Sequence, residues 1–116
     1  MIRSAKNRIV LIDNYIDDTV LLLLDKRKTG VDAIVFTKEA DSKLKLDIEK
    51  HNEQYPLIQV RQFARSHDRF LIIDQDVYHI GASLKDLGKK WFAFCKMEIM
   101  ADEILNKIET ITAVES

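Results

Sequence analysis

His67 and Arg69 lie immediately before four consecutive apolar residues, Phe70 to Ile73, in the stretch SHDRFLIID. Such an apolar run is typical of a strand buried on both faces, so polar side chains at its start need an explanation. Side chains alternate along a strand, which should place His67 and Arg69 on one face with their Cα atoms about 6.6 Å apart. An imidazole and a guanidinium at this separation can both reach a single phosphate group.

Further polar residues follow this pair along the chain. Asp74 comes after the apolar run, and Gly81-Ala82-Ser83-Leu84 follows after six intervening residues. The next basic residues are Lys85, Lys89 and Lys90. These lysines form either a solvated loop or the approach for a polyanion.

The pattern His67-x-Arg69-x-x-x-x-Asp74 with its downstream glycine resembles the phospholipase D superfamily signature, His-x-Lys-x-x-x-x-Asp followed by Gly-Ser-x-Asn. The opening stretch RIVLIDNYID is similar to the start of such domains, so the resemblance covers almost the whole chain. It is strongest to the compact, single-motif domains at the C-termini of bacterial proteins whose N-terminal part resembles phage-type DNA-binding domains. The chain departs from the signature at three positions: Arg69 replaces Lys, Ala82 replaces Ser, and Leu84 replaces Asn.

The resemblance implies a reaction and an assembly. In the family, the motif histidine attacks the phosphodiester phosphorus, and a histidine from a second motif protonates the leaving oxygen. Because this chain has one motif, the resemblance implies a homodimer in which two His67 side chains flank one phosphate. It implies catalytic roles for His67, Arg69 and Asp74, with Asp74 as an orienting group, and it requires no metal or other cofactor. Ser83 is the nearest replacement for the missing Asn, and Lys85 is expected to help bind the substrate.

Two functions follow from this pattern. The first is a phosphodiesterase acting on DNA or RNA, since no membrane-binding surface can be read from the sequence. The second is an inactive domain of the same fold that binds phosphate or nucleic acid, or that dimerises a larger DNA-binding protein. Arg69 and Leu84 favour the second function, because losing one hydrogen-bond donor at such a site commonly lowers turnover about a hundredfold or more. A metal-dependent hydrolase that uses the aspartates is the least supported alternative.

The elements that must position this motif follow from hydrophobic patterning. The predicted strands are Arg8 to Ile12, Val31 to Phe36, Leu57 to Phe63, Arg69 to Ile73, Val77 to Ile80 and Trp91 to Met97. The predicted helices are one from Asp17 or Asp18 to Lys26-Arg27-Lys28, one over Ser42 to Tyr55, and one from about Asp102. Ser42 to Tyr55 alternates like a strand, but a crossover between parallel strands needs about a dozen residues, which favours a helix.

This order predicts an α/β fold with a mixed β-sheet flanked by helices, as in phospholipase D-like domains. The sheet should be parallel in its first half and antiparallel in its second, where Asp74-Gln75-Asp76 closes a β-hairpin. Residues 1–116 are expected to form a single domain. Met1 to Lys6 resembles the end of a helix, so we expect this domain to be the C-terminal part of a longer protein.

Composition narrows the partners and the compartment. The chain of 116 residues carries 18 basic and 19 acidic side chains, so any phosphate binding must be local. Cys95 is the only cysteine, which excludes a disulfide framework within the chain and predicts a cytoplasmic protein. The run Val20 to Leu24 is too short to cross a bilayer, and no secretory signal is visible at the start.

Other polar residues have simpler interpretations than catalysis. Asp17 and Asp18, with Asp13, resemble a metal cluster, but acidic residues at a helix N-terminus explain the first two. A second candidate metal set is equally weak: Asp68, Asp74, Asp76 and His79. His79 is expected to be packed or hydrogen-bonded, and His51 is expected to be exposed on its helix.

Overall fold

The computed structural model describes residues 2–14, 16–38, 41–63, 69–80, 94–97 and 101–115. Within these residues, six strands form one sheet in the order β3-β2-β1-β4-β5-β6. The strands are β1 (Arg8–Ile12), β2 (Asp32–Thr37), β3 (Ile58–Gln62), β4 (Phe70–Ile73), β5 (Asp76–Ile80) and β6 (Phe94–Met97). The helices are a short 3-10 turn (Ile2–Ser4), α1 (Asp18–Leu24), α2 (Ser42–Gln54) and α3 (Ala101–Glu115).

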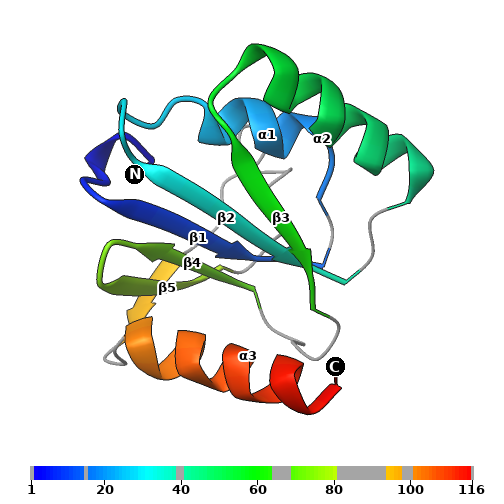
Figure 1. Cartoon of the computed structure of the whole chain (residues 1–116). Coiled ribbons are helices and arrows are strands. Elements are labelled where there is room, and N and C mark those ends of the chain that lie inside the picture. The colour runs from blue at the N-terminus through cyan, green and yellow to red at the C-terminus, as the bar shows by residue number, and fades with distance from the viewer. Residues whose placement is uncertain are drawn as a thin grey trace.

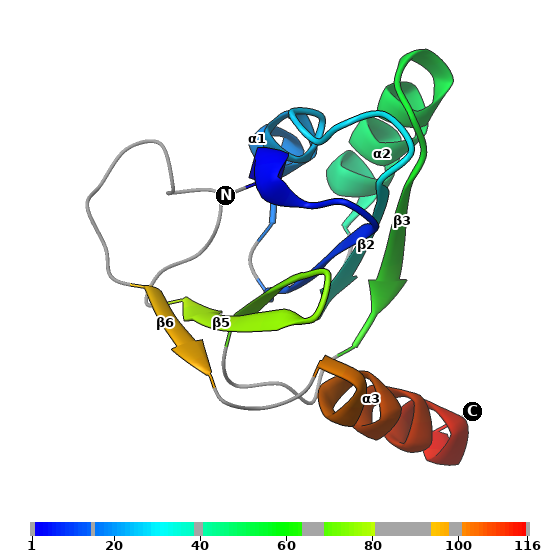
Figure 2. The same ribbon diagram turned by 90° about the vertical axis from the view of Figure 1, so that its left-hand side faces the viewer.

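The sheet is mixed, as the order of elements predicted. Strands β1, β2 and β3 are parallel neighbours, whereas β4 pairs with β1 in the antiparallel sense and continues through β5 to β6. Helices α1 and α2 cover one face of the sheet, and α3 lies against the other face (Figures 1 and 2). The predicted α/β fold and its helix-flanked mixed sheet are therefore confirmed.

Strand β1 lies at the centre of the sheet and is buried on both faces. Ile9 and Leu11 belong to the apolar core beneath α1 and α2, and Val10 and Ile12 belong to the core against α3. The side chains of strand β4 also alternate between the two cores. This burial on both faces explains why the sequences of β1 and β4 are uninterrupted apolar runs.

Side-chain caps define where the two crossover helices begin. Asp17 accepts a hydrogen bond from the backbone N–H of Thr19 at 3.0 Å, and Asp41 accepts one from that of Leu44 at 2.8 Å. Asp17 is thus explained by helix capping. Across the described ranges, no three His, Cys, Asp or Glu side chains gather in a way that would hold a metal ion.

The prediction that His51 is exposed is wrong. Its side chain is buried, and Nε2 lies 2.7 Å from both carboxylate oxygens of Asp25 at the end of α1. Its ring also stacks on that of Tyr55, with centroids 5.1 Å apart. His51 follows Leu44 and Ile48 at helical spacing, and this stripe faces the sheet and α1.

No helix in the described part of the chain has the length and apolarity needed to cross a membrane.

Candidate functional site

Arg69 and Asp13 meet at the edge of the sheet where the parallel strands end. Asp13 directly follows β1 and Arg69 directly precedes β4, and the pairing of Ile12 with Phe70 brings them opposite each other. Arg69 Nε lies 3.6 Å from Asp13 Oδ1. The Asp13 backbone N–H also donates to the carbonyl of Phe36 at 3.0 Å, which fixes the chain at this point.

The two partners differ in burial. The Asp13 side chain has no exposed surface, whereas one third of the Arg69 side chain is exposed. A buried carboxylate needs a charged or hydrogen-bonding partner, and the guanidinium of Arg69 lies close enough to Asp13 to act as one. The guanidinium of Arg69 carries five N–H donors in a planar fork.

Asp74 lies at the opposite end of β4, in the turn of the β4–β5 hairpin. Its backbone adopts a φ of 55°, a left-handed conformation that Asp tolerates better than most residues. The carboxylate accepts backbone N–H groups from Lys6 at 2.9 Å, Asn7 at 2.7 Å and Arg8 at 3.1 Å. These hydrogen bonds, that from Lys6 foremost, hold the pKa of Asp74 below its ordinary value of 3.8.

The structure does not bring Asp74 near Arg69. Five residue steps along an extended strand separate their Cα atoms by about 17 Å. The carboxylate of Asp74 instead joins the hairpin to the start of β1, and Arg8 Nε returns a hydrogen bond to the Asp74 carbonyl at 2.9 Å. The other predicted site residues, His67, Ser83 and Lys85, lie outside the described residues.

His79 was expected to be packed or hydrogen-bonded, and this prediction is confirmed. Its position in β5 is opposite Phe70 in β4, and the two rings meet edge to face with centroids 5.6 Å apart.

The sequence reasoning considered Asp13 only as part of a possible metal cluster, and it missed Thr37 and Gln62 at the ends of the parallel strands. Asp13 follows β1, Thr37 ends β2 and Gln62 ends β3. Open α/β sheets bind ligands outside the carboxyl ends of their strands, so this edge is where ligands are expected. The signal was present in the sequence, because Asp13 and Thr37 each terminate an apolar run.

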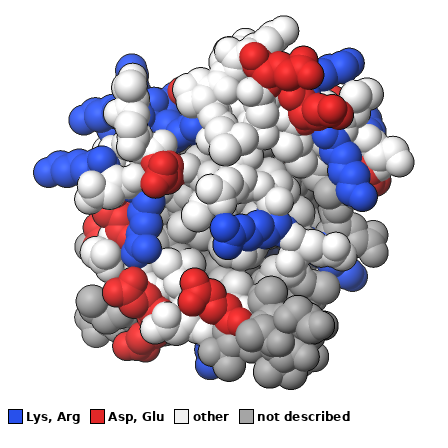
Figure 3. Space-filling model, in the orientation of Figure 1, with Lys and Arg blue, Asp and Glu red and all other residues white. Residues whose placement is uncertain are grey.

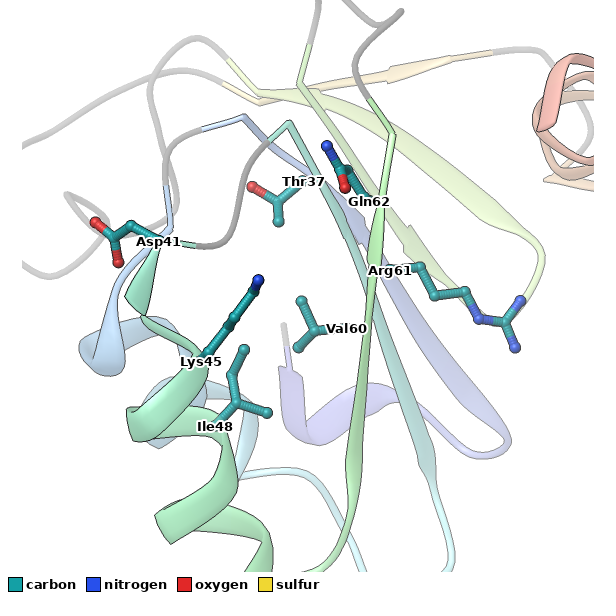
Figure 4. Close-up of a pocket in the computed structure, with 7 residues that line it drawn as sticks. All are labelled: Thr37, Asp41, Lys45, Ile48, Val60, Arg61 and Gln62. Carbon is teal, nitrogen blue, oxygen red and sulfur yellow. The ribbon is translucent and has the colours of Figure 1, made fainter. Parts of the chain in front are cut away.

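A pocket of about 550 Å³ opens at this edge, between α2 and the ends of β2 and β3 (Figure 4). Its lining residues are Thr37, Asp41, Lys45, Ile48, Val60, Arg61 and Gln62.

Charges of both signs are interspersed over the face seen in Figure 3, in keeping with the net charge of −1. On this face, a ligand with negative charge would therefore be recognised at individual residues rather than by a broad basic surface.

Comparison with known proteins identifies a similar fold. No protein-family model matches the chain, and no curated protein gives a significant match. Among solved structures, TrmBL2, described as an archaeal chromatin protein with a novel mode of DNA binding, is similar with a TM-score of 0.55 and 17% sequence identity. The similarity covers 98% of this chain and 45% of TrmBL2, so the chain spans less than half the length of that protein.

Proposed function

We propose that this chain is a phospholipase D-like domain that binds phosphate groups of nucleic acid as a homodimer and does not hydrolyse them. The observation that carries the proposal is the contact between half-buried Arg69 and fully buried Asp13 at the carboxyl edge of the sheet. A guanidinium held by a buried carboxylate is oriented before any ligand arrives, which reduces the entropy lost on binding. Its planar fork suits two phosphate oxygens at once.

The same contact argues against phosphodiester hydrolysis. In the signature that the chain resembles, a Lys occupies the position of Arg69, and a carboxylate beside the cation offsets part of the charge that would stabilise a transition state. Leu84 replaces the Asn and has no hydrogen-bonding group. Asp74 is engaged by three backbone N–H groups at the far end of β4, which favours a structural role over an orienting one.

Nucleic acid is the favoured polyanion for two reasons. The resemblance drawn from the motif is to domains that accompany DNA-binding segments. A solved structure with a similar fold belongs to a protein described as binding DNA. Both reasons support a DNA-associated protein in which this domain contributes phosphate contacts and the dimer.

The competing function is a metal-independent phosphodiesterase with His67 as nucleophile. The spacing of His67 to Asp74 and the following Gly81 favour it. In that case the dimer must bring two His67 side chains to one phosphate, and Ser83 must supply the donor that Leu84 lacks.

One set of assays separates these functions. The purified domain is incubated with single- and double-stranded DNA, RNA and a chromogenic phosphodiester, with and without EDTA, beside the His67→Ala variant. We expect salt-dependent binding of nucleic acid without hydrolysis. Hydrolysis that resists EDTA and disappears in His67→Ala would establish the phosphodiesterase, and hydrolysis abolished by EDTA would establish a metal-dependent enzyme.

The binding role of Arg69 needs a control for folding. Arg69→Ala leaves the Asp13 carboxylate buried without its cation, so it is compared with the double variant Asp13→Asn, Arg69→Ala, which removes both charges. We expect both variants to bind nucleic acid more weakly than the parent and with a shallower salt dependence. Unchanged binding by a folded double variant would contradict a phosphate-binding role for Arg69.

Light scattering should give twice the chain mass of 13.5 kDa, and a strictly monomeric domain would contradict the dimer.

A further inference from the structure

The pocket between α2 and the strand ends of β2 and β3 is distinct from the Arg69–Asp13 contact. Arg69 and Asp13 are not among its lining residues. Its volume of about 550 Å³ lies within the range of small-molecule sites, which is roughly 300–1,000 Å³. The base of the pocket is apolar, formed by Ile48 and Val60, and its polar groups come from three separate elements.

Thr37 is the most informative of these groups. Its side chain is 1% exposed, and Oγ1 has no hydrogen-bond partner among the described residues. The preceding side chains on this face of β2 are those of Ala33 and Val35, and a valine would fill the position of Thr37 without burying a hydroxyl. A buried hydroxyl without a partner is unfavourable unless something binds it, and this one lines the pocket.

Lys45 supplies a positive charge in the same pocket. Figure 4 shows its side chain extending from α2 toward Thr37, with the carboxylate of Asp41 directed away. Asp41 is occupied as the cap of α2, accepting the N–H of Leu44, and Lys45 forms no ion pair with any described residue.

We propose that this pocket binds a small organic phosphate, with the phosphate between Lys45, Thr37 and Gln62 and the organic part over Ile48 and Val60. Lys45, Thr37 and Gln62 belong to α2, β2 and β3 and each carries a hydrogen-bond donor, and a phosphate with three terminal oxygens can accept from all three. A planar carboxylate would be matched better by a planar guanidinium fork, but the guanidinium of Arg61 extends on the opposite side of β3 (Figure 4). This ligand is additional to the nucleic acid of the proposed function and depends on different residues.

The test is an NMR titration of the intact chain with AMP and with ribose 5-phosphate, using adenosine and ribose as uncharged controls. We expect saturable binding of both phosphate esters, with amide shifts centred on Thr37, Lys45 and Gln62. Lys45→Gln should weaken binding roughly tenfold, as expected for a charge-assisted hydrogen bond. Thr37→Val should weaken it several-fold while the protein stays folded.

Two control variants test whether the ligand binds in this pocket. Lys43→Gln changes an exposed lysine of the same helix that does not line the pocket, so it should leave binding unchanged. Equal weakening by Lys43→Gln and Lys45→Gln would reduce the effect to nonspecific charge and overturn the proposal. If only the Asp13→Asn, Arg69→Ala variant lost binding, the phosphate ester would bind at the Arg69–Asp13 contact, and the pocket proposal would be overturned. Absence of saturable binding at millimolar ligand would also overturn the pocket proposal. Nucleic-acid binding through Arg69 depends on different residues and is tested separately.

Discussion

The two edges of the parallel half of the sheet treat their polar groups differently. At the edge where the strands begin, side chains are bound by the backbone: Asp74 accepts N–H groups ahead of β1, and Arg27 donates to the carbonyls of Val31 and Leu57 ahead of β2 and β3. At the edge where the strands end, Asp13 is buried against Arg69, whose side chain is one third exposed, and Thr37 has a hydroxyl without a described partner. Backbone contacts stabilise the first edge, and the polar groups of the second edge are those to which we assign ligand binding.

This difference separates the two motif residues that flank β4. Arg69 lies at the edge where the parallel strands end and Asp74 at the edge where they begin, although both are part of the pattern that resembles one sequence signature. A residue at such a position can therefore act by fixing the strand rather than by contacting a ligand.

The largest effect is expected for Asp74→Ala. This change removes the acceptor for three backbone N–H groups and places a side chain that disfavours positive φ at the turn. Unfolding in urea should occur at a clearly lower denaturant concentration. Asp74→Asn, which tolerates the turn conformation and keeps one acceptor oxygen, should lie between Ala and the parent. Equal stability of Asp74→Ala and the parent would contradict the structural role of this carboxylate.

The same residue predicts a pH dependence. The folded-state pKa of Asp74 is lowered by its backbone hydrogen bonds, so the ionised form favours folding. That contribution is complete well above the ordinary value of 3.8 and is lost as the pH falls through 3.8 toward the lower folded-state value. Urea midpoints measured across this acidic range should fall less steeply in Asp74→Asn than in the parent. If the urea midpoints of the two proteins fell equally with pH, Asp74 would not be the source of the pH dependence.

The next effect is that of Arg69→Ala on stability. Removing one partner of a buried ion pair costs about 3–5 kcal/mol, and the partial exposure of Arg69 should reduce this to about 1–3 kcal/mol. The double variant with Asp13→Asn should recover part of the loss, because no charge is then left buried. A double variant that equals the sum of its two single changes would show that the contact has no coupling energy.

A smaller loss is expected for Asn52→Ala at the edge where the parallel strands begin. The Asn52 side chain donates to the carbonyl of Ile58 at 3.2 Å and accepts from its N–H at 3.0 Å, which joins α2 to the start of β3. Loss of both hydrogen bonds should lower the free energy of unfolding by about 1–2 kcal/mol in urea denaturation. Exposed Glu53→Ala in the same helix turn is the matched control and should change stability little.

The smallest effect, and one of opposite sign, is expected for Thr37→Val. Replacing a buried hydroxyl that lacks a partner with a methyl group should stabilise the ligand-free protein by up to about 1 kcal/mol. Thermal unfolding would show this as a modestly higher midpoint. A clear loss of stability would mean that the hydroxyl is satisfied in solution, and the contrast between the two edges would weaken.

Most of the fold could be predicted because its signals are local. Apolar runs marked β1, β2 and β4, and acidic caps marked the starts of α1 and α2. The Ser42 to Tyr55 segment was ambiguous from periodicity alone, and the length needed for a parallel crossover decided correctly for a helix.

The site could be predicted only in part, because its contacts join distant parts of the chain. Nothing near Asp13 in the sequence indicates Arg69 as its partner, which depends on β4 pairing with β1. The partners of Asp74 are backbone groups at the start of the chain, and backbone N–H groups leave no residue-type signal. His51 was placed on the surface because its partner, Asp25, belongs to another helix.

The two-sided burial of β1 has a consequence for the order of folding. Its face toward α1 and α2 can be covered as soon as the first three strands and their crossovers form, since those contacts are close in sequence. Its other face, with Val10 and Ile12, is covered by α3, which follows all six strands along the chain. During synthesis an apolar sheet surface therefore remains exposed until α3 has left the ribosome, and exposed apolar surface of this kind favours aggregation.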